Sequence, residues 1–288
     1  MQKIPVRHFN QAQKEPDFSG SFSIRDLDIL LAGNDMVQEL HRHDFHYILA
    51  LKRGVGKHAI DFIPYTVSDY SIFLMRPGQV HELMLEVGCT GYLLQFRDDF
   101  YYARDKQSNE LLRKAGKSNY HQADFDGFEK LLKILTNISE EYIGKQEGYQ
   151  EVIKANLGIL FIELIRLSNR IVSDKVNLYT QERLETLLSL IEINIFSIKS
   201  VSDYASLMNL SAYQLNTITQ KTLGKTCSEV INEHIILEAK RFLLATSNQI
   251  NQIADHLGYD DVSYFIRFFK KHTGHSPESF RQNFKGVS

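Results

Sequence analysis

Three histidines in the N-terminal third of the chain have the spacing of a shared binding site. The segment HRHDFHY places His41 and His43 two residues apart, and the segment RPGQVHEL brings His81 after a Pro-Gly turn. Alternate residues of a β-strand face the same side, so His41 and His43 could converge with His81. Three converging imidazoles could bind a metal ion, line a pocket for a small ligand, or form hydrogen bonds within a core. The sequence leaves these three interpretations open.

A second group of side chains, near the C-terminus, has the types that read DNA. Arginine can chelate O6 and N7 of guanine, and asparagine can pair with N6 and N7 of adenine. Arg267 and Asn216 are side chains of these two types, and Lys270 and Lys271 carry the positive charge that can hold phosphates. For Arg267 the alternative is a surface arginine or an intramolecular salt bridge.

The segment around Arg267 has the pattern of two helices joined by a tight turn. Gly258 permits the turn, Asp260 or Asp261 can cap the second helix, and Gly274 ends it. The apolar positions recur at helical spacing and are Ile253, Ala254 and Leu257 in the first helix and Val262, Phe265 and Phe269 in the second. This is the layout of a helix-turn-helix that presents one helix to a DNA major groove.

The same pattern occurs earlier in the chain, from Val201 onward. There Asn209 stands in the place of Gly258, Ser211 is the cap, and Gly224 ends the helix. Residues 229–245 lie between the two units and contain no glycine or proline, which predicts one continuous helix. Two similar units joined by a rigid rod form an internal repeat.

Residues 180–285 resemble the AraC/XylS class of bacterial transcription regulators. The resemblance rests on A-x3-N-x-S-x3-L with its closing glycine, on EAKRFLL, and on the block IA-x3-GY-x4-YF-x-R-FFKK-x-TG-x-SP-x-FR. It implies that each helix-turn-helix offers one helix to DNA. By position in the family motif, the DNA-binding residues are Tyr213, Asn216, Thr217, Gln220 and Lys221 in the first unit and Val262, Ser263, Ile266, Arg267, Lys270 and Lys271 in the second.

The two units are expected to bind DNA with different strength. Members of the family commonly carry an arginine and a phenylalanine where this chain has Thr217 and Thr219. The second unit lies in a basic segment: residues 262–288 hold one acidic residue, Glu278, against Arg267, Lys270, Lys271, Arg281 and Lys285. The sequence therefore predicts that the second unit anchors the protein and that the first contributes more weakly or reads other bases.

The N-terminal region, residues 1–120, reads as a series of short antiparallel strands. Alternating runs such as HYILALKRG, KHAIDFIPYTV and CTGYLLQF are separated by Gly, Asp and Pro turns, which indicates a small barrel or jelly roll. Together with the histidine motifs, this region resembles the cupin barrel, which serves as the effector-binding domain in many members of the regulator family. The resemblance implies an effector pocket at His41, His43, Tyr47 and His81. Metal-binding cupins usually add a glutamate after H-x-H, and here Tyr47 stands near that place, so no metal site is assigned.

Two helices are expected after the barrel, in residues 121–172. Apolar residues recur at helical spacing on both sides of a break at residues 144–148. The resemblance implies that such a hairpin joins two copies into a homodimer, and the alternative is packing within the monomer. Residues 173–182 are polar and predict a linker, which leaves residues 183–288 as the DNA-binding domain. The predicted fold class is α+β multidomain: a cupin-like β-barrel with a helical hairpin, then an all-α domain with two helix-turn-helix units.

Composition is compatible with this interpretation but does not lead to it. The net charge is −2, so no global basic field indicates nucleic acid. Cys89 and Cys227, the only cysteines, form neither a disulfide framework nor a cysteine zinc site. The first residues lack the apolar run of a signal peptide, and no segment reaches about 20 apolar residues. A cytoplasmic protein without membrane contact is expected.

The sequence thus predicts a sequence-specific, DNA-binding transcription regulator controlled by a small-molecule effector in the barrel. Its partners would be double-stranded DNA, the effector, a second copy of the chain and, for an activator, RNA polymerase. No catalytic residue, metal or cofactor is predicted. Two alternatives stay open: a metal-dependent cupin enzyme fused to a DNA-binding domain, and a constitutive regulator whose barrel is purely structural.

Overall fold

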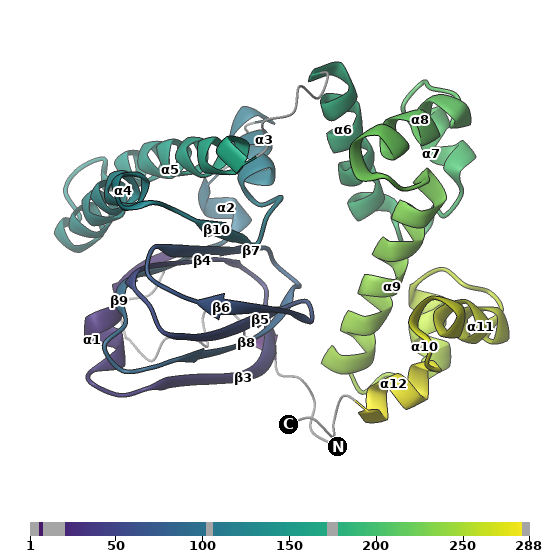
Figure 1. The fold of residues 1–288 in the computed structure, drawn as a ribbon, viewed down its shortest axis with the longest axis horizontal. Helices are drawn as coiled ribbons and strands as arrows, with labels where there is room; N and C mark the ends of the chain where they lie inside the picture. The colour runs from purple at the N-terminus through teal and green to yellow at the C-terminus, as the bar shows by residue number, and fades with distance from the viewer. Residues whose placement is uncertain (1–5, 8–20, 102–105, 172–177, 284–288) are drawn as a thin grey trace. The chain divides into compact units, whose positions relative to one another are not determined.

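The computed structural model describes residues 6–7, 21–101, 106–171 and 178–283 (Figure 1). The described residues up to Ile171 form one compact unit, and those from Leu178 form another. The first unit combines strands with helices, and the second is entirely helical in its described residues. The α+β fold class predicted from the sequence is confirmed.

Two five-stranded sheets make up the barrel of the first unit. One sheet has the order β1-β3-β8-β5-β6 and the other has the order β10-β7-β4-β9-β2. The strands are β1 (Val6–Arg7), β2 (Phe22–Asp26), β3 (Met36–His43), β4 (His46–Arg53), β5 (Gly56–Ile60), β6 (Ile63–Val67), β7 (Ser71–Met75), β8 (Val80–Leu85), β9 (Thr90–Phe96) and β10 (Tyr120–Gln122). Three short helices accompany them: α1 (Leu27–Leu31), α2 (Asp98–Tyr101) and α3 (Lys106–Ala115).

Strand β4 shows how both faces of the second sheet are buried. Tyr47 and Leu49 belong to the apolar cluster between the sheets, whereas Ile48 and Ala50 belong to a second cluster beneath helices. Side chains alternate across a strand, so the continuous apolar run of β4 supplies both clusters at once. The barrel interior is therefore separated from the outer face of this sheet.

The outer face is covered by α4 (Phe125–Gly144) and α5 (Tyr149–Ile171), which run across it in Figure 1. The side chain of Asp124 caps α4 by accepting a hydrogen bond from the backbone N–H of Gly127 at 2.8 Å. The inner stripes of the two helices pack on the sheet through residues that include Phe128, Leu131, Leu157 and Phe161. The hairpin thus packs on its own barrel, and its predicted role in dimerisation stays a prediction.

The second unit is built around one long helix. Its elements are α6 (Leu178–Asn194), α7 (Val201–Leu207), α8 (Ala212–Leu223), α9 (Cys227–Ala245), α10 (Ile250–His256), α11 (Val262–Thr273) and α12 (Pro277–Asn283). Helix α9 is the predicted rod. In Figure 1, α7 and α8 lie near its beginning, and α10 and α11 lie near its end. One apolar cluster includes buried residues from α6 to α11 and continues along this rod.

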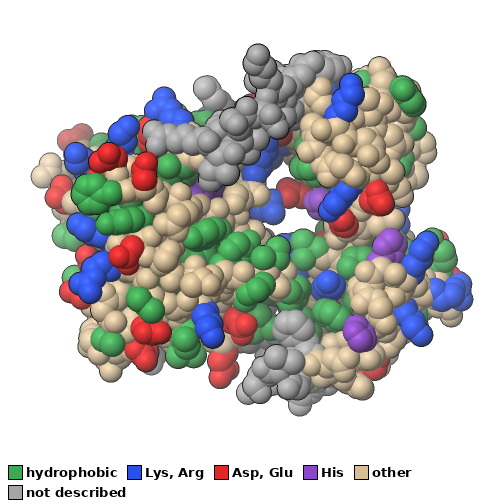
Figure 2. All heavy atoms as spheres, viewed as in Figure 1, with side chains coloured by type: hydrophobic (Ala, Val, Ile, Leu, Met, Phe, Trp, Pro, Cys, Tyr) green, Lys and Arg blue, Asp and Glu red, His purple; other side chains and the backbone are tan. Residues whose placement is uncertain are grey.

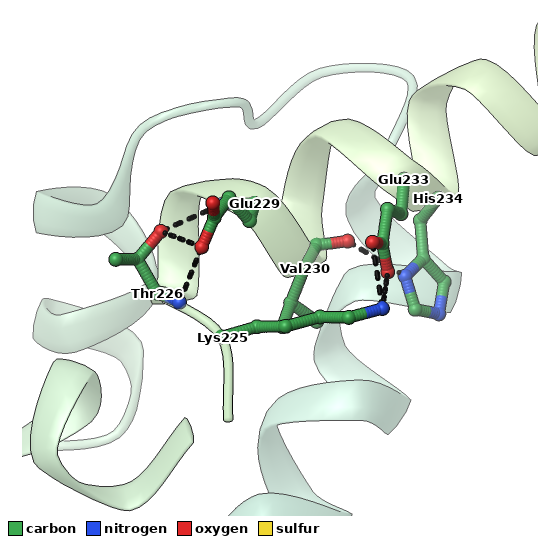
Figure 3. A network of polar contacts seen from close by, with 6 residues as sticks. All are labelled: Lys225, Thr226, Glu229, Val230, Glu233 and His234. Atoms are coloured by element: carbon green, nitrogen blue, oxygen red, sulfur yellow. Dashed lines mark hydrogen bonds and ion pairs between the residues drawn. The ribbon is translucent and has the colours of Figure 1, made fainter. Parts of the chain in front are cut away.

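The start of α9 is fixed by a network of polar contacts (Figure 3). The Thr226 hydroxyl accepts a hydrogen bond from the backbone N–H of Glu229 at 3.2 Å, and Glu229 accepts from the backbone N–H of Thr226 at 2.7 Å. This capping box satisfies donors that the first turn of a helix leaves without partners. The hydrogen bonds from Thr226 lower the pKa of Glu229. Lys225 adds an ion pair to Glu233, 2.7 Å from Nζ to Oε1.

Two predictions from the sequence need correction. The first part of the predicted linker 173–182, up to residue 177, lies outside the described residues. The rest, from Leu178, is the start of helix α6 and is therefore not a linker. Arg281, counted with the basic segment, is buried: its guanidinium donates to the backbone oxygens of Leu243, at 3.0 Å, and Asn248, at 2.8 Å. It ties α12 to the end of α9 instead of facing solvent. Lys285 lies outside the described residues.

No helix among the described residues has the length and hydropathy needed to cross a membrane.

Candidate DNA-reading surface and barrel histidine site

The turns of the two helix-turn-helix units are closed by the same backbone hydrogen bond between equivalent residues. In the first, the backbone N–H of Leu210 donates to Ala205 O at 2.9 Å, and Asn209 has a φ of 53°. In the second, the N–H of Tyr259 donates to Ala254 O at 2.9 Å, and Gly258 has a φ of 71°. The repeat seen in the sequence is thus a repeat of conformation, with an asparagine in the left-handed position of the first turn.

Glycine is required only in the second turn. A Cβ on Gly258 would lie 2.1 Å from the backbone oxygen of Phe196. The side chain of Lys199 also reaches this turn, with Nζ donating to Gly258 O at 2.8 Å. The turn of the second unit is therefore packed tightly against the segment that follows α6.

Helix α11 exposes a cationic face. Phe265 and Phe269 are fully buried, and this fixes the opposite side of the helix outward. The exposed residues include Ser263, Tyr264, Arg267, Lys270 and Lys271, and α11 contains no acidic residue. Figure 2 shows several Lys and Arg side chains on the surface of the part of the second unit where α11 lies.

Not all of the predicted residues of α11 share this face. Ser263, Arg267, Lys270 and Lys271 are exposed, whereas Ile266 is half-buried and Val262 packs against the apolar cluster. Asp261 caps the helix by accepting from the backbone N–H of Ser263 at 2.8 Å.

Helix α8 offers a different surface. Tyr213 is 80 % exposed, and Gln220 and Lys221 are also exposed. Lys221 is the only charged residue in the helix. The capping box of Ser211 with Gln214 starts α8, as predicted for Ser211.

Asn216 and Thr217 are half-buried, and their polar atoms are engaged within the protein. Asn216 Oδ1 accepts the backbone N–H of Cys227 at 2.9 Å, and its Nδ2 donates to Ala212 O at 3.1 Å. The hydroxyl of Thr217 donates to Tyr213 O at 2.9 Å. Pairing with adenine uses both amide atoms of an asparagine, and in Asn216 both atoms already hold contacts within the protein.

The length of α9 suits two successive grooves. Its 19 residues span about 28 Å at a rise of about 1.5 Å per residue. Successive major grooves on one face of the duplex are about 34 Å apart. Helices held near the two ends of such a rod can therefore enter neighbouring grooves.

The barrel histidines meet as their spacing predicts. His41 and His43 lie on β3 and His81 on β8, where His41 and His81 are directly paired across the sheet. The Nε2 atoms are 3.1 Å apart between His41 and His43, 2.8 Å between His43 and His81, and 3.0 Å between His81 and His41. All three side chains are buried. Tyr47, the fourth residue predicted for the pocket, stacks on His43 with ring centroids 5.4 Å apart.

Sequence reasoning missed His58, which contacts the cluster from β5. Its Nε2 atom lies 2.9 Å from Nδ1 of His81. Burial, together with a smaller effect from His41, lowers the pKa of His58 to about 3. The alternation of KHAID could have indicated an inward-facing histidine, because Lys57 is exposed and His58 is buried. His46 belongs elsewhere, with Nε2 2.8 Å from Asp98 Oδ1.

Both units match known families. Residues 32–145 match the family of AraC-like ligand binding domains, and residues 204–283 match a helix-turn-helix domain family. The HTH-type transcriptional activator RhaS of Escherichia fergusonii is 24 % identical over 249 residues, covering 84 % of this chain and 87 % of that protein. The chain belongs to the AraC/XylS family. The protein is accordingly a DNA-binding transcription regulator with an AraC-like ligand-binding domain, as the sequence predicts.

Further known proteins and solved structures are similar to all or part of the chain. YfiF of Bacillus subtilis, named as an uncharacterized HTH-type transcriptional regulator, is 25 % identical over 254 residues, covering 85 % of this chain and 79 % of its own. Among solved structures, unsaturated fatty acid bound ToxT from Vibrio cholerae covers 93 % of this chain and 97 % of its own at 16 % identity, with a TM-score of 0.42. The C-terminal domain of yesN from Fusobacterium nucleatum covers 35 % and 98 % at 28 % identity, with a TM-score of 0.33.

Proposed function

We propose that this regulator reads a specific DNA site in two successive major grooves, with α11 as the stronger contact and α8 as the weaker. The observation that carries the proposal is the exposed face of α11, where Ser263, Arg267, Lys270 and Lys271 stand on a helix held by buried Phe265 and Phe269. In this arrangement Arg267 reads a guanine, while Lys270 and Lys271 contact phosphates.

Helix α8 reads its groove with a nearly neutral surface. Tyr213, Gln220 and Lys221 are the exposed members of the predicted set, and they supply one positive charge between them. We propose that α8 refines the choice of site, because phosphate attraction at this helix is weaker than at α11.

A small molecule bound in the barrel is proposed to control DNA binding. His41, His43, Tyr47 and His81 offer polar atoms among the apolar residues of the barrel interior, beside the buried His58, which is the composition of a small-ligand pocket. Such a ligand alters DNA occupancy only if it binds the DNA-competent state with a different affinity from the other state. We assign the barrel a sensory role and no catalytic role, in keeping with relatives that are named as regulators.

A second copy of the chain is the proposed protein partner. The helical hairpin keeps apolar side chains in solvent after it has packed on its own barrel: Ile143 is 77 % exposed, and Ile159 is 48 % exposed. Dimerisation through this surface would place two DNA-binding units on one operator. Contact with RNA polymerase is expected if the protein activates transcription. A cytoplasmic location is proposed because the protein acts on DNA.

Selection from a pool of randomised duplexes tests the proposed function. Full-length protein should enrich one site, with two conserved segments whose centres lie about one helical turn apart. Enrichment of no sequence over the starting pool would refute specific reading. Adding candidate metabolites to the binding reaction then tests control by the barrel.

A further inference from the structure

We propose that His41, His43 and His81 together bind one divalent first-row transition-metal ion inside the barrel. Among the residues that the structure describes, they are the one group of three or more His, Cys, Asp or Glu side chains placed to hold a metal ion. This proposal goes beyond effector control and does not depend on DNA reading, so the two can fail separately.

The three contacts among the Nε2 atoms cannot all be hydrogen bonds at once. An imidazole nitrogen carries either a proton or a lone pair, so it either donates or accepts. The three nitrogens are in mutual contact at 2.8 to 3.1 Å. Whichever of them carry protons, at least two of the three are in the same state, so either two lone pairs or two N–H groups face each other and cannot form a hydrogen bond. A cation at this point accepts all three lone pairs and removes the conflict.

Outer hydrogen bonds orient two of the rings for metal binding. His41 Nδ1 lies 2.6 Å from the backbone oxygen of Glu39, which can only accept, so the proton of a neutral His41 sits on Nδ1 and its Nε2 presents a lone pair. His81 Nδ1 lies 2.9 Å from His58 Nε2, which can accept its proton in the same way. Such bonds to the second ring nitrogen are the usual support of metal-binding histidines.

The spacing of the three nitrogens also fits a coordination geometry. A metal–nitrogen distance of about 2.1 Å with ligands at about 90° separates neighbouring nitrogens by about 3.0 Å, whereas tetrahedral angles separate them by about 3.4 Å. The observed 2.8 to 3.1 Å matches three ligands on one face of an octahedron. Imidazole ligands suit zinc, copper, iron and nickel. The other coordination positions are then available to water or to an oxygen donor of the effector.

Titration of tag-free, full-length protein tests the proposal. After metal is stripped with a chelator and the chelator is removed, Co²⁺, Ni²⁺ and Zn²⁺ are added in separate calorimetric titrations, and Co²⁺ binding is also followed by visible absorption. We expect one ion per chain, Co²⁺ ligand-field bands, and a melting temperature that rises with metal concentration. Absence of stoichiometric binding of all three ions by the wild-type protein would overturn the proposal.

Variants locate the ion. His43→Gln and His81→Gln keep much of the side-chain volume and should each weaken binding at least ~100-fold, because loss of an outer partner alone costs about 10–100-fold. His58→Gln tests that outer partner and should fall in the range of about 10–100-fold. His272→Gln, at an exposed position of α11, is the matched control and should bind as the wild type does. Wild-type affinity in His43→Gln and His81→Gln would place the ion elsewhere and refute the site. If either variant fails to fold, the wild-type cobalt spectrum still decides whether nitrogen ligands hold the ion.

Discussion

Replacing Arg267 by alanine separates base reading from the stability of α11. The guanidinium lies 3.7 Å from Asp261 Oδ2, and both side chains are largely exposed, at 69 % and 63 %. An exposed ion pair of this kind contributes about 0–1 kcal/mol, so the variant should unfold within about 1 kcal/mol of the wild type. On the selected DNA site the same change should cost about 1–3 kcal/mol, which is roughly a 5- to 150-fold loss of affinity.

Fluorescence anisotropy on two duplexes of equal length measures the effect, one with the selected site and one scrambled, at a fixed salt concentration. Arg267→Ala should weaken the first much more than the second. Arg267→Lys keeps the charge but loses the bidentate geometry, so it should also lose selectivity while binding scrambled DNA normally. Equal losses of affinity on both duplexes for Arg267→Ala would refute base reading by this residue.

The remaining predictions concern a phosphate contact and three buried or half-buried groups. Lys270→Ala should weaken selected and scrambled DNA alike and reduce the salt slope by about 1, and an unchanged slope would remove it from the phosphate contacts. Asn216→Ala leaves the N–H of Cys227 without its side-chain acceptor and should lower the free energy of unfolding, measured in urea, by about 1 kcal/mol. Weaker DNA binding with an unchanged free energy of unfolding would instead support base reading by Asn216. Burial lowers the pKa of His121, so below about pH 6.5 the unfolded chain takes up a proton that the folded chain excludes. The free energy of unfolding should therefore fall as the pH drops below that value, and it should fall less steeply in His121→Asn. Burial raises the pKa of the Cys227 thiol to about 11, so a disulfide reagent should modify it only after unfolding, and rapid reaction of the native thiol would contradict this.

Local patterns in the sequence were sufficient to predict the DNA-binding unit. Gly258 and Gly274 mark a turn and a helix end because each needs a left-handed backbone conformation, and both have positive φ angles in the structure. Asn209 was identified as the counterpart of Gly258 by its place in the repeat, and it has the same conformation. The strands of the barrel were predicted from short apolar or alternating runs between turns, and the two-residue spacing of His41 and His43 predicted that they could converge with His81.

What the sequence did not reveal depends on contacts between distant residues. The amide of Asn216 is held by the first turn of the next helix, and Arg281 reaches backbone oxygens more than 30 residues earlier. Nothing in the types of these two residues distinguishes a structural role from a DNA contact. His58 joins the other histidines through strand pairing alone, because β5 lies beside β8. The start of α6 was missed because residues 171–181 show no helical pattern of apolar positions and resemble a linker.

Dimethyl sulfate interference on the selected site tests the central claim most directly, because it reports contacts to guanine N7 in the major groove. Reading by α8 and α11 predicts two groups of interfering positions on one face of the duplex, with centres about 10–10.5 base pairs apart. Arg267→Ala should remove interference at one guanine in one group and leave the other group unchanged. A single group of interfering positions, or none, would contradict a protein that reads DNA with both helices.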